Sequence, residues 1–157
     1  MREILFRAKR KNWQEFPKEE WWVEGSYHHQ TDYYGESCDK NYIIDGTETD
    51  MEGYGEHYEI DPKTLCQYTE LKDNNGKRIW ENDIVKCNKR KDGFEFYKVL
   101  WRKYYADFGV EPLEFGIQYP IGLGENEQDI KGCNYEVIGN VFDNSELLKG
   151  DQSCTDL

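Results

Sequence analysis

No part of this 157-residue sequence keeps the apolar spacing of a long amphipathic helix. Such a helix repeats apolar residues at i, i+3, i+4 and i+7 over about three turns, and no window sustains that repeat. Glycines and Asp/Asn clusters instead divide the chain into short pieces rich in β-branched and aromatic residues. The sequence therefore predicts a mainly β protein, at the β-rich end of the α+β class.

The short pieces predict strands at residues 4–8, 21–27, 42–44, 58–60, 83–87, 94–101, 115–118 and 135–142. The last is the clearest, because Tyr135, Val137 and Val141 share one face, and Gly139 stands where a strand can bend or bulge. Residues 36–61 hold nine acidic residues against one Lys. We interpret them either as a long acidic loop or as a loosely held hairpin.

A short helical turn is expected after the last strand. Asn144 or Ser145 can accept hydrogen bonds from the exposed N–H groups of its first residues, and Glu146 favours the positive end of a helix. Leu147 and Leu148 then supply apolar side chains that can dock on the body of the protein.

Charge is unevenly distributed along the chain, whose formal net charge is −12. Residues 71–110 hold 10 basic and 6 acidic residues, whereas the segments before and after them each have a net charge of −8. Proteins that bind duplex DNA gain affinity by neutralising phosphates, so the chain as a whole should repel nucleic acid. Only the middle segment can attract it.

The segment Met1–Arg7 has no apolar core of a signal peptide, and no apolar run reaches the roughly 18–20 residues that span a bilayer. We therefore expect a cytoplasmic protein that does not enter the membrane. The five cysteines include no Cys-x-x-Cys pair, which favours reduced structural thiols over disulfides or a zinc site. His28 and His29 are adjacent and point to opposite faces of a strand, so we predict neither a metal site nor a cofactor.

Three segments of the chain carry a family resemblance. Residues 67–85 read QYTELKDNNGKRIWENDIV, residues 135–148 read YEVIGNVFDNSELL, and FRAKR at Phe6–Arg10 precedes the WVEG of Trp22–Gly25. In this order they resemble the signature of the YopX family of phage and prophage proteins. Glu70 and Asn82 stand where that family usually has Gly. If those glycines adopt a positive φ, Asn82 can replace one at modest cost and Glu70 replaces the other less readily.

The resemblance implies a small N-terminal β region, residues 1–65, that carries the acidic stretch. A C-terminal SH3-like barrel over residues 66–150, which includes the helical turn, follows from the same resemblance. The polar composition of residues 151–157 predicts a flexible tail. It implies a phage or prophage origin, and no activity.

The residues of the central segment predict a structural role for it. Asp73–Gly76 has the composition of a turn, in which Asx side chains bond to the local backbone. A calcium loop is excluded because Leu71 stands where such a loop needs an oxygen ligand. We expect apolar side chains to enter the core directly after the turn, from Ile79, Trp80, Ile84 and Val85.

The strongest binding candidate is the basic and aromatic segment 86–105. Cationic groups beside stackable rings are typical of proteins that bind single-stranded nucleic acid, and an aromatic groove on an SH3-like barrel also binds peptides. The same residues equally fit a solvated turn and a barrel core. The candidate residues are Lys86, Lys89, Arg90, Lys91, Lys98, Trp101, Arg102, Lys103 and Tyr104.

Our functional hypothesis is a non-enzymatic accessory protein that binds a macromolecule, a host protein rather than nucleic acid. The alternatives are a nucleic-acid-binding barrel that uses residues 86–105 and a small-molecule enzyme, although no nucleophile elbow or phosphate-binding loop is present. The many Tyr and Trp residues leave a homo-oligomer open, since exposed aromatic side chains are enriched at interfaces.

Overall fold

The computed structural model describes residues 4–46, 55–87, 94–113, 121–123 and 135–148. The chain divides into two compact units, Met1–Tyr68 and Thr69–Leu157. Antiparallel strands dominate both, and the helices in the described ranges are 3-10 turns of three or four residues, which confirms the mainly β prediction. None of these helices is long and apolar enough to cross a membrane.

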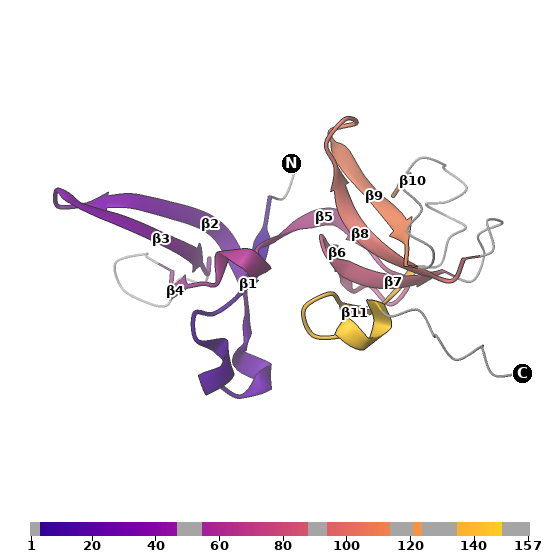
Figure 1. Cartoon of the computed structure of the whole chain (residues 1–157), viewed down its shortest axis with the longest axis horizontal. Helices are drawn as coiled ribbons and strands as arrows, with labels where there is room; N and C mark the ends of the chain where they lie inside the picture. Colours follow the sequence, from indigo (N-terminus) through magenta and orange to yellow (C-terminus); the bar gives the residue numbers. More distant parts are fainter. Residues whose placement is uncertain (1–3, 47–54, 88–93, 114–120, 124–134, 149–157) are drawn as a thin grey trace, which may run out of the picture. The chain divides into compact units, whose positions relative to one another are not determined.

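Unit 1 is built on one antiparallel sheet with the strand order β4-β3-β2-β1-β5 (Figure 1). Strand β5 begins in this unit, where Cys66 and Gln67 pair with β1, and continues into unit 2. The strands are β1 (Phe6–Lys9), β2 (Trp22–Tyr33), β3 (Glu36–Ile44), β4 (His57–Glu59) and β5 (Cys66–Lys72).

A long two-stranded ribbon extends from this sheet (Figure 1). Strand β1 pairs with Trp22–Gly25 of β2, and among the described residues the rest of β2 pairs with β3 alone. Tyr34 and Gly35 close the ribbon with φ of 49° and 82°, the left-handed angles of a tight hairpin turn. The acidic stretch, residues 36–61, forms a hairpin in its described part, because β3 and β4 pair antiparallel. Residues 47–54 lie outside the described ranges.

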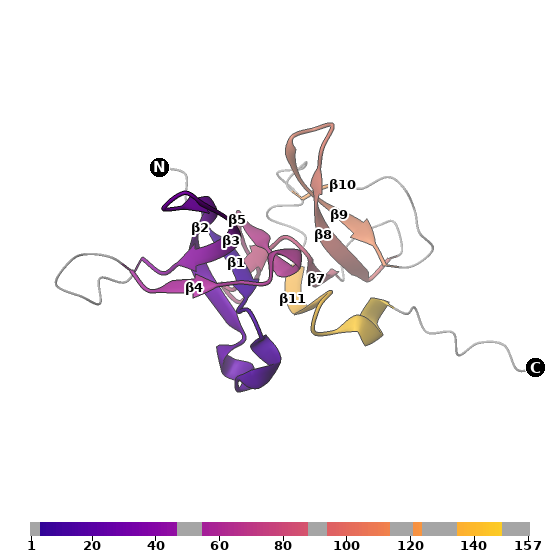
Figure 2. The ribbon, with the colours of Figure 1, turned by 60° about the vertical axis from the view of Figure 1, so that its left-hand side comes forward.

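Unit 1 also contains three 3-10 turns in its described residues. η1 (Trp13–Glu15) and η2 (Lys18–Glu20) connect β1 to β2 and lie together in the indigo loop of Figure 2. In η3 (Pro62–Thr64), the Thr64 hydroxyl accepts a 2.8 Å hydrogen bond from the Lys9 N–H. The buried core is small, consisting of Ala8, Ile43 and Ile60, against which Phe6, Val23, Tyr27 and Leu65 pack.

Unit 2 contains a five-stranded antiparallel sheet with the order β10-β9-β8-β7-β11, and β6 pairs with β5. In the described residues this sheet is open, with β10 and β11 at its edges, so the SH3-like barrel stays a prediction. The elements are β6 (Arg78–Trp80), β7 (Asp83–Cys87), β8 (Phe96–Arg102), β9 (Asp107–Pro112), β10 (Ile121–Gly122), β11 (Tyr135–Asn140) and η4 (Ser145–Leu148).

The core of unit 2 is larger than that of unit 1. Ile79, Trp80, Ile84 and Val85 are all buried, as the sequence predicts. The pairing of β11 with β7 shifts at Gly139, where the predicted bulge lies. The main buried cluster consists of Ile79, Val85, Cys87, Tyr97, Val99, Val110, Leu123, Tyr135 and Val137.

Most predicted strands coincide with observed ones, and β7 has the predicted bounds. The helical turn predicted after residue 143 is η4. The predicted strand at 115–118 lies outside the described residues. Strands β5, β6, β9 and β10 were not predicted. Polar residues dominate β5, a glycine and a proline interrupt β9, and β10 has two residues.

Candidate functional site

Six of the nine predicted binding residues lie in the described part of the chain, on β7, on β8 and in the turn after β8. Lys89, Arg90 and Lys91 lie outside it. The structure thus places Lys86 on β7, Lys98, Trp101 and Arg102 on β8, and Lys103 and Tyr104 in the β8–β9 turn.

Arg102 is buried, with 5% of its surface exposed. Its guanidinium donates two hydrogen bonds to Asp107, from Nε to Oδ1 at 2.7 Å and from Nη2 to Oδ2 at 2.5 Å. These bonds hold the pKa of Asp107 below its usual value. The planar pair joins the last residue of β8 to the first of β9, so Arg102 clamps the hairpin instead of facing a ligand.

Lys86 is also engaged. Its Nζ lies 2.9 Å from Oε1 of Glu95, and the hydrogen bond to this carboxylate raises the pKa of Lys86. Lys98 lies opposite Ile84 on one side and Glu111 on the other, in the middle of the sheet. The predicted cationic patch is therefore partly neutralised by its own neighbours.

Three aromatic residues of the segment are exposed, whereas Tyr97 is buried in the core of unit 2. Trp101, Tyr104 and Tyr105 are 41%, 97% and 69% exposed, and they account for three of the six large apolar side chains exposed in the described ranges. We call these three residues together with Lys103 the aromatic turn. Tyr105 and Ala106 donate backbone hydrogen bonds to the Arg102 carbonyl, so the exposed rings stand on an ordered turn.

A second basic and aromatic cluster, in unit 1, was missed by the sequence interpretation. Lys9 is only 1% exposed, although it carries an ammonium group. Its Nζ lies 3.7 Å from the ring centroid of Trp13, 4.7 Å from that of Trp21 and 5.6 Å from that of Trp22. Cation–π attraction of this kind strengthens when the cation is desolvated.

The neighbouring arginines are held in the same way. The Arg10 guanidinium lies 3.9 Å from the Phe16 ring and 5.3 Å from the Tyr58 ring, and it pairs with Glu20 at 3.3 Å. Arg7 lies 4.8 Å from the Trp22 ring. The alternation of basic and aromatic residues over positions 7–22 was the available signal, and it is the same signal that drew attention to residues 86–105.

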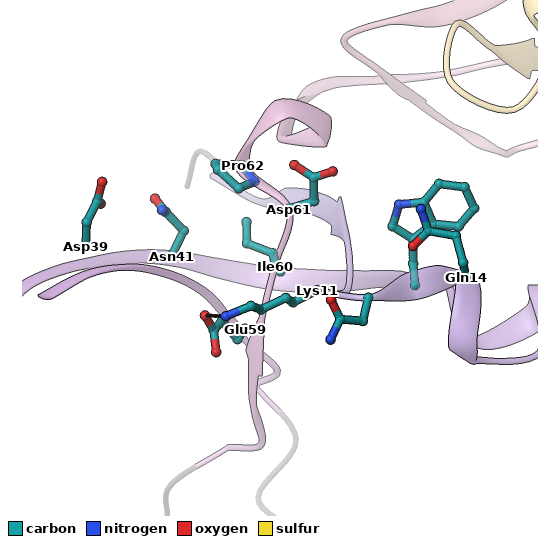
Figure 3. Close-up of a pocket in the computed structure, with 10 residues that line it drawn as sticks. Lys11, Gln14, Asp39, Asn41, Glu59, Ile60, Asp61 and Pro62 are labelled. Carbon is teal, nitrogen blue, oxygen red and sulfur yellow. Dashed lines mark hydrogen bonds and ion pairs between the residues drawn. The ribbon is translucent and has the colours of Figure 1, made fainter.

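An open pocket of about 460 Å³ lies in unit 1 beside these residues. Figure 3 shows Asp39 and Asn41 of β3 at one end, Gln14 at the other and Ile60 between them. Lys11 and Glu59 form an ion pair at 2.6 Å, and the Tyr27 hydroxyl donates to Asn41 at 2.7 Å. The lining residues are Lys11, Asn12, Trp13, Gln14, Asp39, Asn41, Glu59, Ile60, Asp61 and Pro62.

The pocket offers amide and carboxylate groups that can hydrogen-bond to a polar ligand. Its lining includes no Ser, Cys or His, and the amine of Lys11 is engaged by Glu59. A nucleophile with a base beside it is thus not formed by these ten residues. One lining residue, Asp39, contacts a histidine outside the lining: Nε2 of His29 lies 2.7 Å from its carboxylate.

The central signature segment has a structural role in unit 2. The buried carboxylate of Asp73 accepts backbone hydrogen bonds from Asn75, Lys77 and Val137 at 2.8, 2.9 and 3.0 Å. Burial alone would raise the pKa of Asp73, but the three N–H donors outweigh it, and the pKa lies below its usual value. One side chain therefore closes the turn and fixes β11.

Two further signature positions, Glu70 and Asn82, have left-handed backbone angles, with φ of 68° and 65°. Both thus adopt the conformation that glycine reaches without steric cost, as we expected if the family glycines have a positive φ. Asn tolerates these angles well, whereas Glu holds them at a cost to stability.

Comparison with known proteins gives a family and no activity. A family profile described as YopX protein matches residues 5–149. The crystal structure of protein EF1440 from Enterococcus faecalis is similar over 95% of this chain and 100% of that chain, with 23% sequence identity and a TM-score of 0.47. No curated protein matches. Because the profile spans nearly the whole sequence and includes all three resembling segments, the chain belongs to the YopX family.

Proposed function

We propose that this protein is a non-enzymatic accessory protein of a phage or prophage that binds a protein of its bacterial host through the aromatic turn. The observation that supports the proposal is the exposure of Trp101, Tyr104 and Tyr105 on a turn that the Arg102–Asp107 pair holds in place.

Exposed aromatic rings on an ordered turn are well suited to protein recognition. Tyr and Trp supply most of the binding energy at many protein interfaces, because each buries a large area and keeps a polar group for hydrogen bonding. A turn that is already ordered loses little conformational entropy when it binds. We also propose that β5 to β11 form an SH3-like barrel, a fold in which surface aromatic residues bind peptides.

Nucleic acid is a weaker candidate for the same surface. Lys103 precedes two exposed tyrosines in the sequence, and proteins that bind single-stranded nucleic acid combine basic and aromatic side chains in this way. Against this, the charge of Arg102 is held by Asp107 and that of Lys86 by Glu95, and the net charge of −12 opposes phosphate binding. A small-molecule enzyme is the third candidate, and the unit 1 pocket is where its substrate would bind.

The test is affinity capture of host proteins on the tagged chain, with and without nuclease, followed by binding measurements with the purified partner. We expect a partner that survives nuclease and binds about tenfold more weakly to the double variant Tyr104→Ala, Tyr105→Ala. Tyr34→Ala is the matched control, since Tyr34 is 93% exposed on the hairpin of the other unit.

Two outcomes would overturn the proposal. Loss of every partner on nuclease treatment would assign the surface to nucleic acid. A partner that binds the double variant as tightly as the unchanged chain would place the interface elsewhere.

A further inference from the structure

Within the described residues, the outer backbone edge of β2 has no neighbour over much of its length. Strand β1 pairs with Trp22–Gly25, and from Ser26 to Tyr33 no described residue forms backbone hydrogen bonds with that edge. An unpaired edge of this length is a template for the addition of another strand.

The edge also lacks the features that normally prevent strand addition. Proline, lysine and bulges protect natural sheet edges, and residues 26–33 contain no proline and no lysine. The one irregularity of the ribbon lies between Gln30 and Asp32, where β2 advances by two residues while β3 advances from Lys40 to Ser37. The extra residue is therefore on β3, and β2 itself stays regular.

We infer that this edge pairs antiparallel with β2 of a second copy of the chain, in the register centred on Gln30. In an antiparallel ladder the N–H and C=O of one residue point to the same side, and alternate residues point outward. Two copies of β2 can therefore pair only when even-numbered residues face even-numbered ones and odd-numbered residues face odd-numbered ones.

Among the registers that meet this condition, those centred on Gln30 and on His29 use the segment equally well, and the side chains that they bring together distinguish them. The register centred on Gln30 places His28 of each copy opposite Asp32 of the other, so two complementary pairs form around one two-fold axis. Both side chains are exposed in the structure. The register centred on His29 would bring two His29 side chains together, and the one centred on Thr31 would place Asp32 opposite Gln30.

The complementarity of the His28 ring, which can donate a hydrogen bond, to the Asp32 carboxylate is what selects a second copy over an unrelated strand. His28 and Asp32 lie four residues apart on one face of a regular strand, so the same sequence read in the opposite direction is its own complement. His29 lies on the opposite face, where it contacts Asp39 of its own ribbon. It therefore does not compete for Asp32 of the second copy.

Sedimentation velocity over a range of concentrations tests the inference. We expect the unchanged chain to pass from the 18.7 kDa monomer to a species of twice that mass as concentration rises. His28→Asp places carboxylates opposite Asp32 and should weaken the dimer about tenfold. The double variant His28→Asp, Asp32→Lys places a lysine of each copy opposite the new carboxylate of the other in the same register, and it should restore the dimer.

Hydrogen exchange locates the interface independently of the variants. Peptides that cover residues 26–33 should become more protected as concentration rises, whereas those from β4 should not change. A chain that stays monomeric at millimolar concentration would overturn the inference. So would a dimer that neither variant affects, or one that His28→Asp dissociates and the double variant fails to restore.

Discussion

The two units of this chain keep charged groups inside in different ways. In unit 1 the cations of β1 and the residue after it lie against aromatic rings, with Lys9 beside three tryptophans and Arg10 beside Phe16. In unit 2 the buried charges are carboxylates that accept backbone N–H groups, as in Asp73, or the ion pair of Arg102.

The difference follows from the apolar cores that each unit has available. Among the described residues, the central cluster of unit 1 has three buried apolar residues, and the buried stem of Lys9 with the half-buried tryptophan rings around it adds to the packed interior. Unit 2 buries nine, and its charges serve instead to close turns and join distant strands. A few Lys and Arg side chains placed against aromatic rings can thus add packed surface to a unit that has few buried aliphatic residues.

The largest expected effect comes from removing the carboxylate that fixes β11. Asp73→Ala leaves three backbone N–H groups without their acceptor, and we expect a loss of about 3 kcal/mol in the free energy of unfolding. Hydrogen exchange measured at increasing urea concentrations should locate this loss of stability in unit 2. Asn74→Ala, at the exposed neighbouring position, is the control, and an equal effect of both variants would contradict the prediction.

A smaller effect is expected in unit 1 from removing the caged cation. Lys9→Met keeps the length of the side chain but loses its charge, and we expect a loss of about 1–2 kcal/mol as the cation–π attraction disappears. Lys18→Met is the control, because Lys18 is exposed and its Nζ lies 6.0 Å from the nearest Trp ring. Unchanged stability of Lys9→Met would mean that desolvation of the ammonium offsets the attraction.

The two units should also respond to opposite ends of the pH scale. The pKa values of Asp73 and Asp107 lie below the ordinary 3.8, so their stabilisation is complete above about pH 4 and is lost as pH falls further. A hydrogen bond to Glu56 raises the pKa of Tyr58 above 10.0, so its smaller contribution to unit 1 is lost only in strong alkali.

Exchange rates measured from pH 2 to 11 check this, once they are corrected for the intrinsic effect of pH. Acid should increase exchange in β7 and β11 before it does so in β1 and β2. If acid opens unit 1 first, the comparison between buried carboxylates and caged cations is wrong.

The smallest expected effect concerns two of the left-handed residues of unit 2, Glu70 and Asn82. Glu70→Gly should stabilise the protein by about 0.5–1 kcal/mol, because it relieves a φ of 68° that costs a non-glycine residue about 1–2 kcal/mol. Asn82→Gly should change the free energy of unfolding by only about a few tenths of a kcal/mol, since Asn tolerates a φ of 65°. Thermal unfolding midpoints of the two variants test the difference, and a loss of stability in Glu70→Gly would contradict it.

The sequence predicted the local features of unit 2 well. The turn at Asp73, the buried pair Ile84 and Val85 and the bulge at Gly139 each depend on residues close together in the chain. Strand β9 escaped prediction because Gly109 stands in its centre. Its small size is required there, since a Cβ atom would lie 2.6 Å from Cδ of Arg102 and 2.6 Å from the Ile121 carbonyl oxygen.

The candidate site was predictable as a segment but not as a set of exposed groups. Nothing in the order of residues 86–105 says that Arg102 is buried against Asp107 while Tyr104 stays in solvent, because that outcome depends on where β9 returns. The cage around Lys9 was missed for a similar reason: its rings come from η1 and from the start of β2, on both sides of a connection that brings them together.

The bond from Val137 to Asp73 joins residues 64 positions apart, and the Asn74 N–H reaches the Tyr135 carbonyl over a similar span. A chain emerging from the ribosome therefore has every strand of unit 1 available after residue 68, while unit 2 waits for its last strand. Until that strand arrives, the Asp73 carboxylate lacks its third donor and the apolar face of β7 lacks its partner. The order of synthesis thus sets the order of assembly, first the unit with caged cations and then the unit with buried carboxylates.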